Sequence, residues 1–298
     1  AELVRRSGQD GSATAIRLDA PFTAFAGSGV HAFRLPAGGT HVVYAATVTA
    51  GLGDQLFRVP TDGSQAGVEL SGPFVNGGGV ILAEGFTPSP DGTRVAFVAD
   101  SVTDEVFELF SAPSDGSAAP VRLGPALAPG TDVEPGLFFT PDGQAVLYRV
   151  HDPARERTEL RIAASATAGV SARLDDEFSP GGEVVDVVLG PGGQRAFYRA
   201  DRALDELFEL FSVRLATPGA PVRLSNPLQV EGPASVAEFF LAPDSGHVVY
   251  HALLGDDYRM GLHARELRGA GRERDLTDSA HWIRDVLGFS VDGRIVYT

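Results

Sequence analysis

Six glycine-containing turns recur along this chain, and an equivalent position, mostly acidic, lies six to eight residues before each turn. Five copies of the position carry an acid and the first copy carries a histidine: Glu84, Glu134, Asp186, Glu238, Asp285 and His31. Carboxylate oxygens are the ligands that hard cations such as Ca²⁺ prefer in proteins. Gathered acids also repel one another unless a cation lies among them. We therefore predict that these residues bind Ca²⁺ or another divalent cation, a cationic ligand group or a protein partner.

A simpler interpretation is that these side chains are solvated or paired with an arginine such as Arg34 or Arg284. Loops expected on the same face carry further acids: Asp54, Asp100, Asp104, Glu105, Asp152, Glu156, Asp201, Asp205, Glu206, Asp256 and Asp257. Their spacing does not match a calcium-binding loop with ligands at alternate positions and a distal Glu. Turn capping and solubility explain them, and a cation-binding or partner-binding face is the alternative. His151 and His251 are further candidates to join His31 in a metal site.

The elements that must position these acids belong to a unit that occurs six times. Each unit contains a turn followed by an alternating apolar run that ends in an aromatic residue, as in Asp91-Gly-Thr-Arg-Val-Ala-Phe97. The turns begin at residues 38, 91, 142, 192, 244 and 292. Asp-Gly and Gly-Gly supply the positive φ angles that a tight hairpin needs. The pattern therefore predicts a short first strand, which lines a central channel, before each turn and a second strand after it.

Two more elements complete each unit. A third strand is predicted at motifs such as Glu108-Leu-Phe-Ser111, and a fourth at motifs such as Val121-Arg-Leu123. The sixth copies of these two elements are at the N-terminus, within residues 1–20. The N-terminal and C-terminal strands would then share one closing unit, which removes exposed sheet edges. Arginines recur in the predicted fourth strand, where we interpret them as charges that protect a sheet edge: Arg17, Arg122, Arg173 and Arg223.

Six cyclically closed units of four strands predict an all-β, six-bladed β-propeller. We expect one domain over residues 1–298, because no linker or change in composition divides the chain, although its length also permits two domains. The expected blades cover these residues: 29–75, 80–124, 133–175, 185–225, 236–277, and 285–298 together with 1–20.

Composition excludes several classes of function. The formal net charge of −15 disfavours nucleic acid and anionic membrane surfaces as partners. No apolar run approaches the roughly eighteen residues of a membrane-spanning helix. The absence of Cys excludes thiol catalysis, and all 24 basic residues are Arg, which excludes a lysine Schiff base. A Gly-x-Ser-x-Gly nucleophile elbow, a His-Glu-x-x-His motif and a phosphate-binding loop are also missing from the sequence.

The repeat resembles that of the TolB-type β-propellers, most clearly over Pro90–Leu123, Pro141–Leu174 and Pro191–Leu224. The resemblance implies six blades and a periplasmic or extracellular location. The namesake also carries an N-terminal α/β domain, for which this chain has no room, because the third-strand motif begins at residue 2. Similar propellers cover the active sites of serine peptidases, but we expect no hydrolase domain in this chain.

Together these patterns predict a non-enzymatic binding or scaffold module. The expected ligand is a protein or a small cationic molecule, held by the acidic face at the channel mouth of a monomer. One alternative is an enzyme that acts on carbohydrate or peptide with carboxylates at the same mouth. The other is a structural extracellular module of a larger protein.

Overall fold

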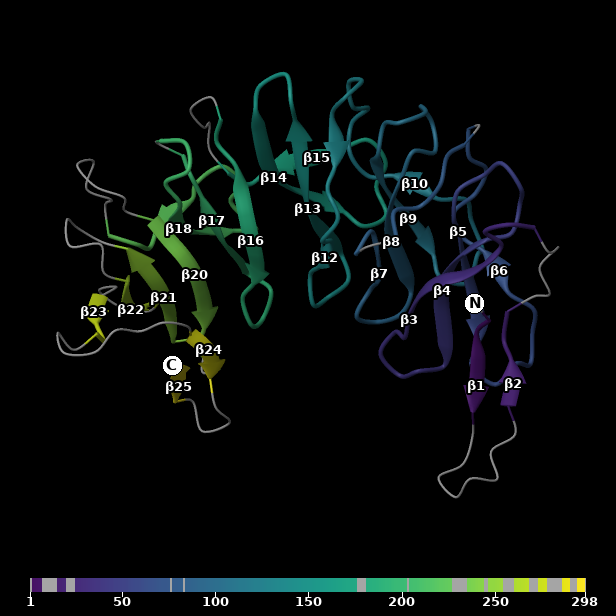
Figure 1. The fold of residues 1–298 in the computed structure, drawn as a ribbon, viewed down its shortest axis with the longest axis horizontal. Coiled ribbons are helices and arrows are strands. Elements are labelled where there is room, and N and C mark those ends of the chain that lie inside the picture. The colour runs from purple at the N-terminus through teal and green to yellow at the C-terminus, as the bar shows by residue number, and fades with distance from the viewer. Residues whose placement is uncertain are drawn as a thin grey trace. The chain divides into compact units, whose positions relative to one another are not determined.

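A computed structural model describes residues 2–6, 15–19, 25–75, 77–82, 84–175, 181–202, 204–226, 235–243, 246–253, 260–267, 273–277, 286–289 and 294–297. Within these residues every regular element is a β-strand, so the predicted all-β class is confirmed (Figure 1). The chain divides into two compact units, the first comprising residues 1–154 and 160–172 and the second residues 155–159 and 173–298.

In the first unit, two sheets have four antiparallel strands that follow one another in chain order. The first comprises β3 (Gly29–Arg34), β4 (His41–Thr47), β5 (Gln55–Pro60) and β6 (Val68–Glu69). The second comprises β7 (Phe86–Pro88), β8 (Arg94–Ala99), β9 (Glu108–Pro113) and β10 (Val121–Arg122). A short hairpin precedes them, in which β1 (Val4–Arg6) pairs with β2 (Ala15–Arg17).

The third sheet has five strands, because two short segments pair with its central strand. It comprises β11 (Asp132–Val133), β12 (Phe138–Phe139), β13 (Ala145–Asp152), β14 (Arg157–Ala164) and β15 (Ser171–Arg173). Both β11 and β12 pair with β13, so the predicted first strand of this repeat is divided in two. The interruption falls at Pro135-Gly136, where proline lacks the backbone donor that a strand uses.

The second unit repeats the four-stranded pattern twice. Its first sheet comprises β16 (Val184–Leu189), β17 (Arg195–Ala200), β18 (Glu209–Arg214) and β19 (Val222–Arg223). Its second comprises β20 (Ser235–Leu241), β21 (His247–Leu253), β22 (Met260–Glu266) and β23 (Glu273–Asp275). A two-stranded sheet of β24 (Val286–Phe289) and β25 (Ile295–Tyr297) follows. The predicted strand order within these sheets is thus confirmed. That β24–β25 and β1–β2 form one blade, and that the propeller has six blades, remain predictions.

The hairpin turns are held by the side chains that the sequence places there. The Asp91 carboxylate accepts hydrogen bonds from the Ser89 hydroxyl at 2.5 Å and the Thr93 backbone N–H at 3.1 Å. Gly92 has a φ of 69°, a left-handed conformation that glycine adopts without steric cost. The hydrogen bond from Ser89, followed by the one from Thr93, lowers the pKa of Asp91 below its ordinary value. These contacts fix the direction in which the second strand leaves the turn.

The core of the sheets repeats one aromatic contact between the second and third strands. Tyr44 stacks on Phe57 with ring centroids 5.4 Å apart, and Phe97 stacks on Phe110 at 5.7 Å. The same contact occurs in the second unit between Tyr198 and Phe211 and between Tyr250 and His263. Such pairs contribute about 0.5–1.5 kcal/mol beyond the burial of their area. Burial also raises the pKa of the Tyr44 phenol to about 12.

The fourth-strand arginines have a more specific role than the edge protection we inferred from sequence. Arg122 lies 3.2 Å from Glu108, and Arg223 lies 3.0 Å from Glu209, in each case joining the fourth strand to the third. The glutamates are buried, so the arginines supply the charge that a buried carboxylate requires. In the first sheet the acid lies on the fourth strand and not on the third. There Gln55 of β5 donates a hydrogen bond to Glu69 of β6 at 3.1 Å.

Candidate functional site

The predicted acidic positions coincide with irregularities in the first strand of several sheets. The ladder registers shift between Val30 and Ala32 in β3 and between Val185 and Val188 in β16, which places His31 and Asp186 at bulges. Asp186 has a φ of 48°. Glu84, just before β7, has a φ of 56°. Left-handed backbone is uncommon for residues other than glycine, and a bulge redirects a side chain out of the regular pleat.

Three of the predicted acids lie against a basic residue of the neighbouring second strand, an arginine in two cases and a histidine in the third. Glu134 lies 3.1 Å from Arg149, and Glu238 lies 3.4 Å from His251. Asp186 accepts a hydrogen bond from Arg199 Nε at 2.7 Å. Arg34, one of the partners suggested by sequence, forms no ion pair with these three acids among the described residues. Each acid has a basic side chain of its own, supplied within the same sheet.

A sequence signal for these partners exists but was missed. Arg149, Arg199 and His251 each follow the tyrosine that ends the predicted second-strand motif. Residues that alternate along a strand point to opposite faces, so the residue after the buried tyrosine faces away from it. The recurring basic residue at this position, combined with the recurring acid of the first strand, predicts a cross-strand ion pair.

The remaining positions differ from one another. Glu84 is exposed, and its backbone carbonyl accepts the Gly136 N–H at 3.1 Å. Asp285 lies outside the described residues, as do Arg284, Asp256 and Asp257. In the described part of the chain, no group of three or more His, Asp or Glu side chains is placed to hold a metal ion. A common cation at the six positions remains a prediction.

At His31 the two residue types are interchanged, because the basic residue lies on the first strand and its acidic partner lies on the connection after β4. His31 Nδ1 lies 2.7 Å from Asp54 Oδ1, which also accepts the Thr47 hydroxyl at 3.0 Å. Two loops approach closely beside Asp54, since a Cβ added to Gly79 would lie 2.7 Å from the Gly53 Cα. A carboxylate hydrogen-bonded to one imidazole nitrogen orients the ring.

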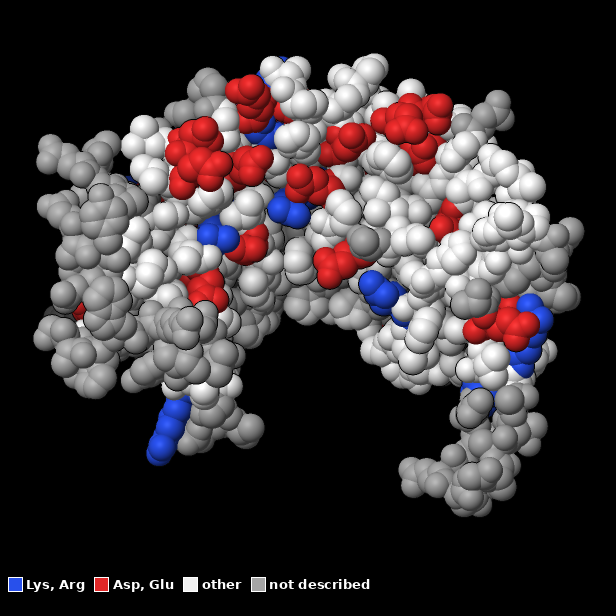
Figure 2. Space-filling view, viewed as in Figure 1, with Lys and Arg blue, Asp and Glu red and all other residues white. Residues whose placement is uncertain are grey.

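The acids in the connections between second and third strands divide into two groups. Asp100 and Asp201 are buried and cap backbone donors, with Asp100 accepting the Gly79 N–H at 2.6 Å and Asp201 the Glu206 N–H at 3.0 Å. Glu105 and Glu206 are exposed. In each unit taken by itself, Figure 2 shows exposed acidic side chains near the strand ends at the top of the view, where these connections lie. Turn capping thus accounts for Asp100 and Asp201.

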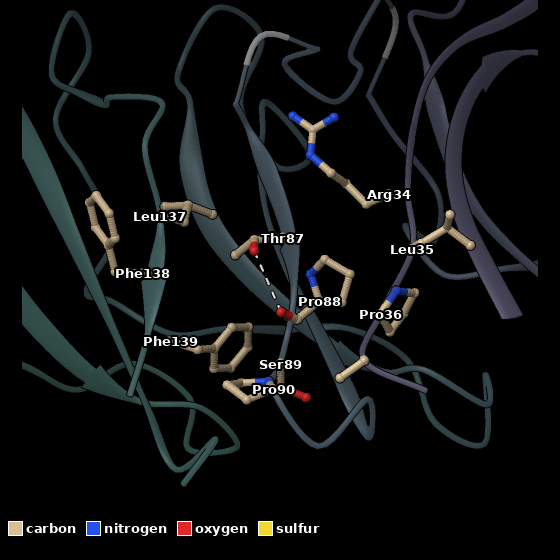
Figure 3. Close-up of a pocket in the computed structure, with 11 residues that line it drawn as sticks. Arg34, Leu35, Pro36, Thr87, Pro88, Ser89, Pro90, Leu137, Phe138 and Phe139 are labelled. Atoms are coloured by element: carbon tan, nitrogen blue, oxygen red, sulfur yellow. Dashed lines mark hydrogen bonds between the residues drawn. The ribbon is translucent and has the colours of Figure 1, made fainter. Parts of the chain in front are cut away.

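A cavity of about 390 Å³ lies in the first unit, at the opposite end of the first strands from the predicted acids. Three neighbouring segments line it (Figure 3). Leu137 and Phe138 come from β12 and the residue before it, Thr87–Pro90 from β7 and its turn, and Arg34–Ala37 from the end of β3. The side chains that line it are apolar apart from Arg34 and the hydroxyls of Thr87 and Ser89. Sequence reasoning missed this cavity.

The polar groups of this cavity are not equally available to a ligand. The Ser89 hydroxyl is committed to the turn, where it donates to Asp91 and accepts the Arg94 N–H. The Arg34 guanidinium donates to the Phe33 carbonyl at 3.0 Å and lies 5.3 Å from the Phe86 ring. Among the described residues Arg34 forms no ion pair. Arg34 is therefore the charged group that this cavity offers.

No helix that could cross a membrane is found among the described residues. No protein-family model and no curated protein sequence matches the chain.

Solved structures of peptidases do resemble it. A prolyl endopeptidase, characterised for the role of inter-domain dynamics in catalysis and specificity, is 13% identical with a TM-score of 0.52, and the match covers 94% of this chain and 40% of that one. A putative dipeptidyl aminopeptidase IV from Bacteroides ovatus is 14% identical with a TM-score of 0.56, covering 85% and 40%. Prolyl oligopeptidase B from Galerina marginata is 13% identical with a TM-score of 0.52, covering 87% and 39%.

These matches concern the β-propeller parts of the peptidases, and the chain spans about two fifths of their length. At such low identity they show similarity of fold alone. They support a β-propeller fold without confirming the TolB type. Our prediction of a non-enzymatic binding or scaffold module is wrong, because the similar structures are peptidases and favour the peptide-acting alternative. The recurring acids belong to no catalytic motif, so the sequence contained no positive signal for an enzyme.

Proposed function

We propose that this chain is the β-propeller part of a peptide-acting hydrolase and that it receives the peptide. The observation that carries the proposal is the similarity of 85% to 94% of the chain to propellers of three peptidases. One of them was solved with a 35-residue hydrolysis and macrocyclization substrate. The chain's own sequence lacks a nucleophile elbow, so we assign the cleaving step to a hydrolase part outside these 298 residues. The proposal includes six blades, closed by the two ends of the chain.

The 390 Å³ cavity is the place where we expect part of the peptide to bind. Phe138 and Leu137 on one side and Leu35 on the other offer apolar surface (Figure 3). Leu35 is 59% exposed, so its side chain is accessible to a ligand. The three prolines of the lining offer no backbone N–H to a ligand.

Arg34 gives the cavity a preference for charge. A guanidinium without an acidic partner is suited to a carboxylate, which it can bind through two parallel hydrogen bonds. The peptide that fits best therefore presents an apolar side chain next to an acidic residue or next to its C-terminal carboxylate. This preference is opposite to the cationic ligand expected from the net charge.

Peptide binding is tested by fluorescence anisotropy with dye-labelled pentapeptides that carry phenylalanine beside glutamate. Phe138→Ala should weaken binding about tenfold, since it removes apolar contact area worth on the order of 1.5 kcal/mol. Arg34→Gln should weaken the glutamate peptide about fivefold and leave the corresponding glutamine peptide unchanged. The matched control is Phe33→Ala, because Phe33 lies on the same strand as Arg34, is 54% exposed, and does not line the cavity.

Two results would refute the proposal. One is the absence of saturable binding of any peptide at millimolar concentration. The other is an equal loss in Phe33→Ala and Phe138→Ala, which would separate binding from the cavity. The catalytic part is tested by incubating the peptides with the product of the complete gene and detecting fragments by mass spectrometry. Intact peptides after prolonged incubation would exclude a hydrolase of these substrates.

A further inference from the structure

A second cavity, of about 300 Å³, lies in the second unit at the turn end of the sheets. Its polar lining consists of Gln194, Arg195 and Arg214, and its apolar lining includes Phe197, Leu241 and Leu267. Arg195 begins β17 and Arg214 ends β18, while Leu241 ends β20 of the next sheet. The cavity therefore combines two guanidinium groups with an apolar wall.

The two arginines are placed directly opposite each other. Arg195 and Arg214 are Cα partners in the antiparallel ladder, so their side chains leave the same face of the sheet. Like charges at such a position destabilise a sheet. Arg195 donates to the Ser212 hydroxyl at 3.0 Å. Within the described residues neither arginine has a carboxylate partner, although the chain carries a net charge of −15.

Equivalent positions in the other sheets show that this like-charge pair is specific to one sheet. In the second sheet of the first unit, Arg94 also donates to a serine hydroxyl, that of Ser111, at 2.9 Å, but it faces Pro113. In the sheet of β20–β23, His247 faces Glu266. The repeat thus does not require two cations at this position. The fold would form without the repulsion between the two arginines.

The shape of the cavity also depends on a glycine. A Cβ at Gly190 would lie 2.9 Å from the Phe197 ring, a distance that real Cβ atoms essentially never show. Gly190 and Phe197 both line the cavity, so any larger residue at 190 would displace the aromatic wall. Phe197 and Arg195 both belong to β17, and Arg214 lies opposite Arg195 on the paired strand β18, so the aromatic wall and the two cations are held close together.

We propose that this cavity binds a small oxyanion ligand, a carboxylate or a phosphate, that carries an apolar group. The two guanidinium groups would share the oxyanion, which removes their mutual repulsion and uses the bidentate geometry that arginine offers to both groups. The apolar part would lie against Phe197, Leu241 and Leu267. The site is separate from the peptide-binding cavity and lies in the other unit, so it does not depend on the proposed peptide function.

Isothermal titration calorimetry with three probes tests this site: inorganic phosphate, phenylacetate and the uncharged phenylacetamide. We expect saturable binding of phosphate, phenylacetate or both, and no binding of phenylacetamide. Phosphate alone would identify a phosphate site, and tighter binding of phenylacetate would identify a carboxylate site with an apolar pocket. Arg214→Gln should weaken binding at least tenfold, and Arg214→Glu should abolish it. Arg94→Gln is the matched control and should change the affinity less than twofold.

Chemical modification gives an independent readout that does not need a variant. Phenylglyoxal modifies arginine side chains, and mass spectrometry identifies the modified residues. The bound probe should slow modification of Arg195 and Arg214 at least fivefold while leaving Arg34 unaffected. No saturable binding of phosphate or phenylacetate up to 20 mM, roughly the limit of useful affinity, would overturn the proposal. An equal loss of affinity in Arg94→Gln, or equal protection of Arg34, would also overturn it.

Discussion

The two ends of the first strands differ in how their charges are balanced. At the end that carries the predicted acids, Glu134, Asp186 and Glu238 each pair with a basic side chain of the adjacent strand. At the turn end, two cavities contain Arg34 in one unit and Arg195 with Arg214 in the other. These three arginines have no carboxylate partner among the described residues.

This difference shows that abundant charge and available charge are separate properties. Acidic residues dominate the composition, but an acid that is already paired offers little to a ligand, because binding must first break the pair. An unpaired cation in an acidic protein is available, and the surrounding apolar surface strengthens its interaction with an anion. We therefore expect ligands at the turn end, which is the opposite of what the composition suggests.

The largest expected effect tests whether pairing is what stabilises a buried charge. Arg122→Gln removes the partner of Glu108, whose side chain is only 4% exposed, and should cost about 3 kcal/mol of unfolding free energy. Glu108→Gln should cost only about 1 kcal/mol, since water can solvate the half-exposed Arg122. Urea denaturation measures both values. A greater loss in Glu108→Gln than in Arg122→Gln would show that the carboxylate does not depend on its arginine.

A smaller effect of opposite sign is expected at the unbalanced end. Arg214→Glu converts the like-charge pair with Arg195 into an opposite-charge pair at a register position that His247 and Glu266 occupy in the sheet of β20–β23. The free energy of unfolding should rise by about 0.5 kcal/mol. The increase should shrink at 1 M salt, where exposed charges are screened. A variant that is less stable than the parent protein at low salt would contradict the described register.

At the balanced end, neutralising an acid should have little effect. Glu134 and Arg149 are partly exposed, so Glu134→Gln should cost about 0.5 kcal/mol or less. The same variant tests the predicted cation site, because a bound divalent ion would raise the melting temperature. We expect millimolar Ca²⁺ to shift the parent protein and Glu134→Gln equally. A rise in melting temperature that occurs in the parent protein alone would place a cation at Glu134. The acidic end of the first strands would then also bind a ligand, as we propose for the turn end.

The smallest effect concerns acid stability at the turn end. Hydrogen bonds from Ser89 and Thr140 hold the pKa values of Asp91 and Asp142 below their ordinary value. Each carboxylate therefore contributes stability above the unfolded-state pKa of about 3.9, and this contribution is lost as the pH falls through the lower folded-state pKa. Asp91→Asn with Asp142→Asn should flatten the fall in melting temperature below about pH 4. Ser89→Ala should do the same in part. If the fall in melting temperature at low pH is unchanged in all variants, protonation of Asp91 and Asp142 is not linked to folding.

Much of the fold could be predicted from local patterns. Asp91-Gly92 specifies a hairpin through its own hydrogen bonds and its positive φ, and the aromatic Phe97 that ends the following apolar run forms the expected buried contact. The strand order within each sheet followed from the repeat for the same reason. The pairings of Arg122 with Glu108 and of Glu134 with Arg149 join residues of different strands, so they follow only when the recurring residues of neighbouring strands are considered together.

The sequence by itself determined the turns, the strands and their order, because these depend on neighbouring residues and on a pattern that repeats. Tertiary structure decided which charges are available. A ladder register depends on turn geometry and on the face that is buried, so Arg195 and Arg214, nineteen positions apart in sequence, become direct neighbours only when β17 and β18 pair. The bulges that redirect His31 and Asp186 also arise from pairing between strands. Cavities form where several such strands end, so no single stretch of sequence records them.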